Sequence, residues 1–159
     1  MKNIKIEINM QFCQMEELPQ PDQDLVNAAI AATANSYARY SHFNVGAALR
    51  MADGTIVIGA NQENAAFPSG LCAERSAIFA AQSQRPEQAV VALAIAARNA
   101  QGLMDNPISP CGACRQVVLE IEDRYQQPVR ILLYGTRGIY SINSIKDLMP
   151  LAFVDENMR

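Results

Sequence analysis

The sequence has only one histidine, and this scarcity limits the chemistry open to the protein. His42 is the single imidazole among 159 residues, so acid–base work at an active site falls to a carboxylate. No apolar run approaches the ~20 residues that a membrane-spanning helix needs. The net charge is −3, and no cluster of lysine and arginine offers the basic stripe that a polyphosphate backbone requires. These absences argue against a membrane partner and against a nucleic acid partner.

Cysteine is also scarce, with four in the chain. The sequence does not open with a charged segment followed by an apolar one, the pattern that directs secretion. We therefore expect reduced thiols and a cytoplasmic location. A chain of this length can bury one core without disulfides. We expect a single domain over residues 19–159, preceded by residues 1–18 as an N-terminal arm or extra strand, because Ile4, Ile6 and Ile8 alternate with polar residues.

Three of the cysteines fall in two short motifs that together form a candidate metal site. Cys72 is followed two positions later by Glu74, and Cys111 and Cys114 are spaced i, i+3. At the start of a helix, this second spacing lets both sulfurs point at one ion. Three protein ligands leave one tetrahedral position open for water, which distinguishes a catalytic zinc site from a structural one. We expect one Zn²⁺ per subunit on these three thiolates, with Glu74 as the acid–base group.

Two arginines follow the cysteine motifs closely. Three thiolates give a zinc ion a net negative charge, which weakens its ability to acidify water unless hydrogen bonds or cations compensate. Arg75 and Arg115 are placed to donate hydrogen bonds to the sulfurs. Helix N-termini at Cys72 and Cys111 would also help to hold the thiolates.

The order of the expected elements predicts an α/β protein. Apolar residues recur at helical spacing after Pro19, which predicts a helix to about residue 38, and Asp53-Gly54 predicts a hairpin. Expected strands cover residues 45–51, 56–60, 90–97 and 129–134, with a short fifth after residue 138, and further helices begin near residues 72 and 111. This order predicts a three-layer α/β/α sandwich with a mixed five-stranded sheet.

The cysteine motifs resemble a known signature. Cys72-Ala73-Glu74 and Pro110-Cys111-Gly112-Ala113-Cys114 resemble the three-cysteine form of the zinc deaminases, and within that group the sequence is similar to the cytidine deaminases. Residues 41–48 (Ser-His-Phe-Asn-Val-Gly-Ala-Ala) resemble the nucleoside-binding first strand of that family, and residues 61–65 (Asn-Gln-Glu-Asn-Ala) its ribose-binding segment. The resemblance covers about residues 41–153. It implies hydrolytic deamination of cytidine and 2′-deoxycytidine to the corresponding uridines with release of ammonia, a step of pyrimidine salvage.

The resemblance also assigns substrate contacts. It implies that Phe43 packs against the pyrimidine ring and that Asn61 and Glu63 bind the ribose hydroxyls. The backbone N–H of Ala73, with the carbonyl of residue 109 or 110, would orient the ring and its amine. Read without the resemblance, the polar residues at the end of this strand are an ordinary turn cluster.

Four further positions carry expectations about their roles or surroundings. In the family, the phenylalanine of the C-terminal motif reaches a neighbouring subunit's pocket, so Phe153 is expected to complete that site in a homotetramer. Phe67 stands where the family commonly has tyrosine, which removes one hydroxyl. Cys13 lies far from the motifs and is expected to be a half-buried apolar residue. His42 is expected to be an exposed loop residue.

Three other interpretations share part of this pattern. A structural zinc-binding domain would need a fourth cysteine or histidine, and the two spare donors lie far from the motifs. A redox Cys-x-x-Cys leaves Cys72 and Glu74 without a role. A deaminase of a related cytosine nucleoside, such as an aminoacylnucleoside antibiotic, would keep the same zinc core, but Asn61 and Glu63 favour a free ribose.

Overall fold

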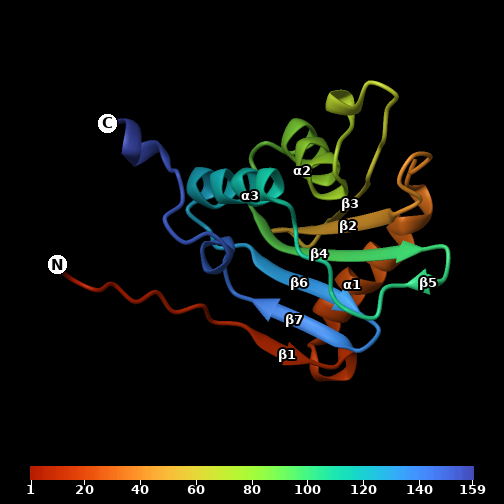
Figure 1. Cartoon of the computed structure of the whole chain (residues 1–159), viewed down its shortest axis with the longest axis horizontal. Helices are drawn as coiled ribbons and strands as arrows, with labels where there is room; N and C mark the ends of the chain where they lie inside the picture. The colour runs from red at the N-terminus through yellow and green to blue at the C-terminus, as the bar shows by residue number, and fades with distance from the viewer.

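A mixed sheet lies between two helical layers in the computed structural model, which describes all 159 residues (Figure 1). The α-helices are α1 (Gln20–Ala32), α2 (Ala73–Gln84) and α3 (Gly112–Tyr125). The strands are β1 (Gln11–Cys13), β2 (Asn44–Met51), β3 (Ile56–Ala60), β4 (Val90–Asn99), β5 (Gly102–Leu103), β6 (Arg130–Gly135) and β7 (Gly138–Ile142). The strand order is β1-β7-β6-β4-β2-β3, and β5 pairs with β4. Only β4 and β6 pair in parallel.

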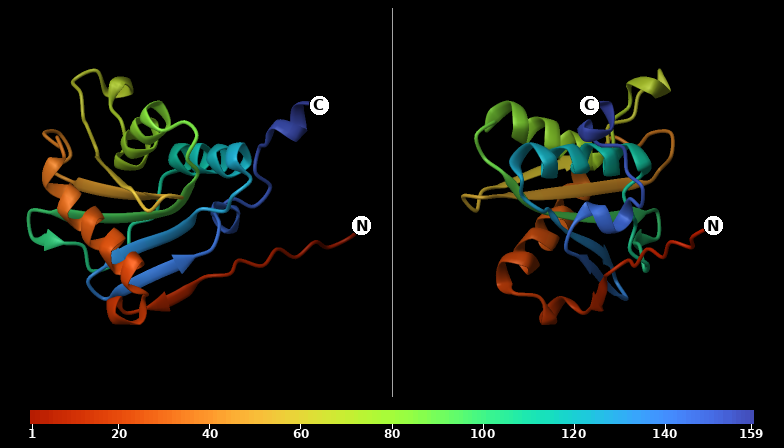
Figure 2. Two further views of the ribbon diagram at one scale, coloured as in Figure 1. Left: turned by 180° about the vertical axis from the view of Figure 1, so that it is seen from behind. Right: turned by 90° about the vertical axis from the view of Figure 1, so that its left-hand side faces the viewer.

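The two faces of the sheet carry separate apolar cores, because successive side chains on a strand point to opposite faces. Leu49, Leu93 and Ile131 belong to a cluster of 18 buried residues that also includes residues of α2 and α3. Their sequence neighbours Ala48 and Leu132 belong to a cluster of 10 with residues of α1. Figure 2 shows α1 on one side of the sheet and α2 with α3 on the other. The predicted α/β/α layering is therefore confirmed.

The sheet has seven strands, so the predicted count of five is wrong. The two extra strands are β1, inside the N-terminal segment, and β5, inside the stretch expected to be a loop. β1 falls in the segment for which an arm or extra strand was expected, at the end of the alternation that starts at Ile4. β5 has two residues, which is too short to show an alternating pattern. No helix combines the length and apolar character needed to cross a bilayer.

The first helix ends earlier than its apolar spacing predicts. It stops at Ala32, and a 3₁₀ turn covers Thr33–Asn35. The chain then leaves the helical path because its backbone pairs with a distant segment. The Tyr37 N–H donates to the Asn61 carbonyl at 3.0 Å, and the Glu63 N–H donates to the Tyr37 carbonyl at 2.9 Å. These bonds bring residues 37–43 against residues 61–63, beside the cavity described below.

Close packing of α2 on β3 fixes the position of the helix N-terminus. A Cβ atom on Gly59 would lie 2.5 Å from the Ala73 carbonyl oxygen and 2.4 Å from the Ala77 backbone nitrogen. Only glycine therefore allows the first turns of α2 to rest directly on the strand.

A buried glutamate on α3 anchors this helix to two later segments of the chain. Glu122 is 4% exposed, and its carboxylate accepts hydrogen bonds from the Val129 and Ile145 N–H groups, both at 2.9 Å, and from the Ser144 hydroxyl at 2.8 Å. These bonds tie α3 to the segment before β6 and to the 3₁₀ turn Ile145–Leu148.

Candidate active site

The N-termini of α2 and α3 bring the two cysteine motifs together. Cys72 and Cys111 are the residues directly before the two helices, and Cys114 lies in the first turn of α3. The first turn of a helix presents backbone N–H groups with no partner inside the helix, and its dipole places partial positive charge there. Both effects stabilise thiolates at this point.

The three thiols form a cluster of the size that zinc requires. The Cys72 and Cys111 sulfurs are 3.9 Å apart, and the Cys111 and Cys114 sulfurs are 3.5 Å apart. All three sulfurs lie within 4.8 Å of one another. Tetrahedral zinc with Zn–S bonds of about 2.3 Å places its sulfur ligands about 3.8 Å apart. The donor set therefore fits one zinc ion.

No fourth cysteine or histidine joins the cluster. Cys13 lies on β1, where it is half-buried and its thiol faces the Ile139 carbonyl at 3.8 Å. His42 is exposed. Both side chains therefore lie as the sequence predicted, and the closed four-ligand arrangement of a structural zinc site is not formed.

The two arginines near the ligands differ in what they contact. The Arg75 guanidinium donates to the Cys72 sulfur at 3.3 Å. Its pKa is raised, first by the hydrogen bond to Cys72 and then by the one to Cys114. Arg115 instead donates to the Pro110 carbonyl at 2.9 Å and to the Leu148 carbonyl at 2.8 Å. Arg115 therefore makes no hydrogen bond to a sulfur in this structure, and its Nε and Nη1 groups bind main-chain carbonyls instead.

The thiols of α3 differ in their tendency to ionise. Burial raises the pKa of Cys111, but hydrogen bonds from the Cys114 backbone and from the neighbouring thiols outweigh it, so the net shift is downward. The pKa of Cys114 is raised by burial first and then by the charge of Glu74. Of these two thiols, Cys111 therefore has the lower pKa and ionises more readily than Cys114.

Glu74 lies in the first turn of α2 and is only 5% exposed. Burial raises its pKa, while its own backbone N–H and the Cys114 thiol act in the opposite direction. It is the buried carboxylate of the site, and its interaction with Cys114 places it beside the sulfur cluster.

A cavity of about 560 Å³ opens beside Cys72. Its volume falls in the range that suits a small organic ligand, roughly 300–1,000 Å³. Its lining residues are Tyr40, Ser41, Asn61, Gln62, Glu63, Asn64, Phe67, Gly70, Leu71, Cys72 and Arg75. The cavity therefore joins the predicted ribose-binding segment to the metal cluster.

The Asn61 side chain supports the start of β2. Its amide oxygen accepts hydrogen bonds from the Val45 N–H at 2.8 Å and from the Ser36 hydroxyl. Its amide nitrogen donates to the Phe43 carbonyl at 3.0 Å. Asn61 lines the cavity, but these three bonds also give it a structural role.

Glu63 holds the adjacent loop. Its carboxylate accepts from the Tyr40 N–H at 2.7 Å and from the Ser41 N–H and hydroxyl. These bonds, with the Ser41 hydroxyl first, lower its pKa, so the side chain is a carboxylate facing the cavity.

Three other residues that were predicted to contact the substrate do not line the cavity. Ala73 is buried as the first residue of α2, and Phe43 is half-buried outside the cavity lining. Phe153 is 58% exposed and does not line the cavity of its own chain. Its carbonyl accepts from the Gln116 side chain at 3.0 Å.

An aromatic pair at the cavity is a feature that sequence reasoning missed. Tyr40 and Phe67 lie edge to face with ring centroids 5.6 Å apart, and both line the cavity. They come from separate loops, so no spacing in the sequence joins them. Phe67 was singled out only as a departure from the family pattern.

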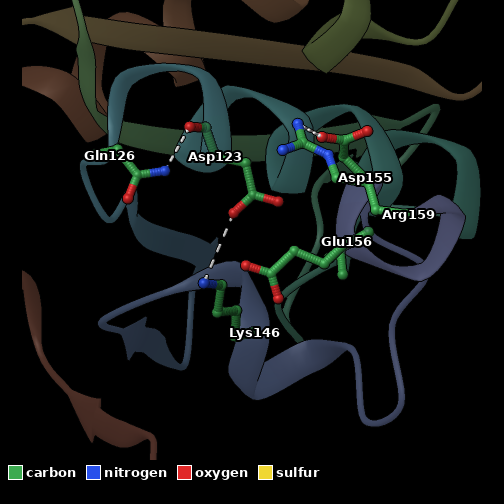
Figure 3. Close-up of a pocket in the computed structure, with 7 residues that line it drawn as sticks. Asp123, Gln126, Lys146, Asp155, Glu156 and Arg159 are labelled. Atoms are coloured by element: carbon green, nitrogen blue, oxygen red, sulfur yellow. Dashed lines mark hydrogen bonds and ion pairs between the residues drawn. The ribbon is translucent and has the colours of Figure 1, made fainter.

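A second cavity, of about 360 Å³, lies between α3 and the C-terminal segment (Figure 3). Figure 3 shows Lys146 directed at Asp123, with a distance of 3.8 Å between the charged atoms, and Arg159 paired with Asp155. This cavity contains no thiol, and its two cations are each paired with an aspartate. We therefore place the chemistry at the cysteine cluster.

Comparison with known proteins agrees with this placement. A family model, the cytidine and deoxycytidylate deaminase zinc-binding region, matches residues 19–126. The cytidine deaminase of Halalkalibacterium halodurans is 40% identical over 136 residues, which are 86% of this chain and 96% of that protein. The cytidine deaminase of Sporosarcina psychrophila is 37% identical over 136 residues, covering 86% and 93%.

A solved structure gives the same result at the level of the fold. The 1.6 Å crystal structure of cytidine deaminase from Burkholderia pseudomallei superimposes with a TM-score of 0.70 at 38% identity, covering 82% of this chain and 97% of that chain. The matched family region includes both cysteine motifs and Glu74. The resemblance identified in the sequence is confirmed, and the chain belongs to the cytidine deaminase family.

Proposed function

We propose that this protein is a zinc-dependent hydrolase that deaminates cytidine and 2′-deoxycytidine to uridine and 2′-deoxyuridine, releasing ammonia in pyrimidine salvage. The observation that carries the proposal is the cluster of three sulfurs, with Glu74 buried against it and a cavity of nucleoside size alongside. A structural zinc domain would need neither the cavity nor the buried carboxylate.

The proposed chemistry divides between the metal and Glu74. Cys72, Cys111 and Cys114 would hold the zinc ion, which would supply an acidified water as the nucleophile for C4 of the cytosine ring. Glu74 would accept one proton from that water and deliver it to N3, then take the remaining proton from the hydroxyl on C4 and give it to the leaving amine, so that the C4 carbonyl forms as ammonia leaves. One carboxylate can serve these transfers if it lies between the metal cluster and the ring.

Ring and amine would be oriented by main-chain groups at the two helix starts. The Ala73 N–H lies in the first turn of α2, where helix geometry leaves it without an intrahelical acceptor. The Pro110 carbonyl already accepts from Arg115, so we assign the contact with the amine to the Ser109 carbonyl. Phe43 would pack against the ring after a shift into the cavity.

Asn61 and Glu63 would bind the ribose hydroxyls from the cavity wall. Both also hold the loop of residues 37–43, so they can position the cavity wall and contact the ligand at once. Phe153 would complete a neighbouring subunit's site in a homotetramer, an assignment supported by its exposure and by its absence from the cavity lining of its own chain. The four unpaired cysteines support a cytoplasmic location.

Zinc analysis combined with an ultraviolet assay tests the proposal. Purified protein is expected to carry one zinc per chain. It is also expected to convert cytidine to uridine catalytically, which is followed by the change in ultraviolet absorbance between the two nucleosides. Protein that carries zinc but leaves both nucleosides unchanged would overturn the assignment. Comparing cytidine with a cytosine nucleoside bearing a bulky ribose substituent separates the proposed substrate from the antibiotic-type alternative.

A further inference from the structure

The first 12 residues carry an apolar stripe that stays largely exposed, although Phe12 at its end packs against Tyr140, with ring centroids 5.2 Å apart. Every even-numbered residue from 4 to 12 is apolar, and every odd-numbered one from 3 to 11 is polar. In extended chain this alternation puts all the apolar side chains on one face. They are Ile4, Ile6, Ile8, Met10 and Phe12, with exposed fractions of 82%, 53%, 52%, 46% and 54%.

The backbone of residues 1–10 has no hydrogen-bond partner in the chain. We call residues 1–10 the N-terminal arm; it runs away from the body as an extension of β1 (Figure 2). None of the loop and turn hydrogen bonds involves it. The strand cannot continue on its own sheet, because β1 pairs with β7 from Gln11↔Ser141 and β7 ends one residue later, at Ile142. An exposed strand with free N–H and C=O groups is a template for pairing with another chain.

We propose that the N-terminal arm pairs antiparallel with the same arm of a second copy, in the register that places Ile6 opposite Ile6 across a two-fold axis. This register puts Lys5 of each copy opposite Glu7 of the other and Ile4 opposite Ile8. Opposite charges at facing positions stabilise an antiparallel pair, and like charges destabilise it. A two-fold contact of this kind uses the same surface on both copies.

The charges select this register over its neighbours. A slip by one residue would set apolar side chains against polar ones. A slip by two residues in one direction sets Lys5 opposite Lys5, and in the other direction sets Glu7 opposite Glu7. Only the proposed register satisfies both the apolar stripe and the charges. Because each arm continues from a sheet edge at β1, the new pair is not an isolated two-stranded ribbon of the marginally stable kind.

The proposal does not depend on the function proposed above. The family match begins at residue 19, beyond the arm, and the arm shares no residue with the cavity beside Cys72. The arm contact would therefore add an interface outside the region that the family model matches.

Cysteine cross-linking tests the register directly. In a Cys13→Ser background, Ile6→Cys places a thiol at the proposed two-fold axis, whereas Asn9→Cys, the control, faces residue 3 of the second copy. Mild oxidation followed by a non-reducing gel is expected to give a covalent dimer with Ile6→Cys and little with Asn9→Cys. No dimer with either variant, or equal yields from both, would overturn the proposal. Cytidine turnover measured in parallel reports only on the active site.

Charge reversal then tests the pairing within the Ile6→Cys protein. Lys5→Glu or Glu7→Lys alone replaces both attractive pairs by repulsive ones and is expected to slow cross-linking roughly tenfold. The double reversal restores opposite charges at facing positions, so its rate should return to that of Ile6→Cys. A double variant as slow as the single ones would contradict the register.

Discussion

Two glutamates are buried to nearly the same degree but differ in the hydrogen-bond donors around their carboxylates. Glu122 is 4% exposed and Glu74 is 5% exposed, and each lies on a helix of the same layer. The Glu122 carboxylate is surrounded by three donors from distant segments. Glu74 has no donor from a distant main-chain segment: burial raises its pKa, and its own backbone N–H, the Cys114 thiol and the charge of Arg75 act in the opposite direction.

The difference shows how burial alone fails to separate structure from function. A carboxylate whose two oxygens are both held by fixed donors stabilises the fold and is not free to exchange protons. A buried carboxylate left without such donors lowers the stability of the fold. Such groups are found mainly at functional sites, where their shifted pKa serves the chemistry. On this reasoning Glu122 anchors α3, and we propose Glu74 as the proton carrier.

The largest expected effect comes from Glu74→Gln. The substitution keeps shape and burial but removes the proton acceptor, so kcat should fall by roughly 10²–10⁴-fold, while bound zinc and the free energy of unfolding stay close to those of the unaltered protein. Steady-state assays with metal analysis and denaturant unfolding check this. Normal turnover by the variant would show that Glu74 is not the proton carrier, and the proposed functional difference between Glu74 and Glu122 would then be wrong.

A smaller effect is expected from the arginine beside the sulfurs. Arg75→Met removes the donor to Cys72, and loss of such a supporting hydrogen bond should weaken zinc binding by about 10–100-fold. Arg115→Met is the matched control, since its guanidinium binds main-chain carbonyls. Zinc affinity measured by chelator competition should respond to the first variant and not the second. Equal losses would mean that overall charge, and not the hydrogen bond, supports the metal.

Glu122→Gln sharpens the comparison from the structural side. The neutral amide is a weaker acceptor and brings an unpaired donor into a buried site, so the free energy of unfolding should fall by about 1–3 kcal/mol. The kcat of the folded protein should stay unchanged. Denaturant unfolding and turnover at low temperature measure the two quantities. A loss of kcat without a loss of stability would assign Glu122 to the chemistry.

The smallest effects are expected on the cavity wall. Asn61→Ala or Glu63→Ala removes a proposed ribose contact and should raise KM by about tenfold for cytidine, equivalent to roughly 1.4 kcal/mol, with less change for a free cytosine analogue. Comparing KM for the two substrates checks this. Equal changes for both would show that these residues act only by holding the loop of residues 37–43.

Much of the site was readable from the sequence because its chemistry is local. The i, i+3 spacing of Cys111 and Cys114 and the nearness of Glu74 to Cys72 follow from helix geometry, and the structure brings all three sulfurs together. The layers were also predictable, since alternation along each strand sorts its residues between the two cores.

What the sequence did not show depends on contacts between distant segments. Arg115 follows a ligand as closely as Arg75 does, yet the Leu148 carbonyl, 33 positions away, helps to direct it away from the sulfur. The end of α1 at Ala32 and the pairing of Tyr40 with Phe67 likewise depend on the loop packing against residues 61–63. Very short strands such as β5 are set by their neighbours and not by their own pattern.

Zinc titration of metal-free protein tests the central claim most directly. After removal of metal by a chelator under reducing conditions, cytidine turnover should be absent and should rise in proportion to added zinc until one equivalent per chain is bound. The Glu74→Gln variant should take up the same equivalent of zinc without gaining activity. Full turnover in the metal-free protein, or one bound zinc with no turnover in the unaltered protein, would contradict the account.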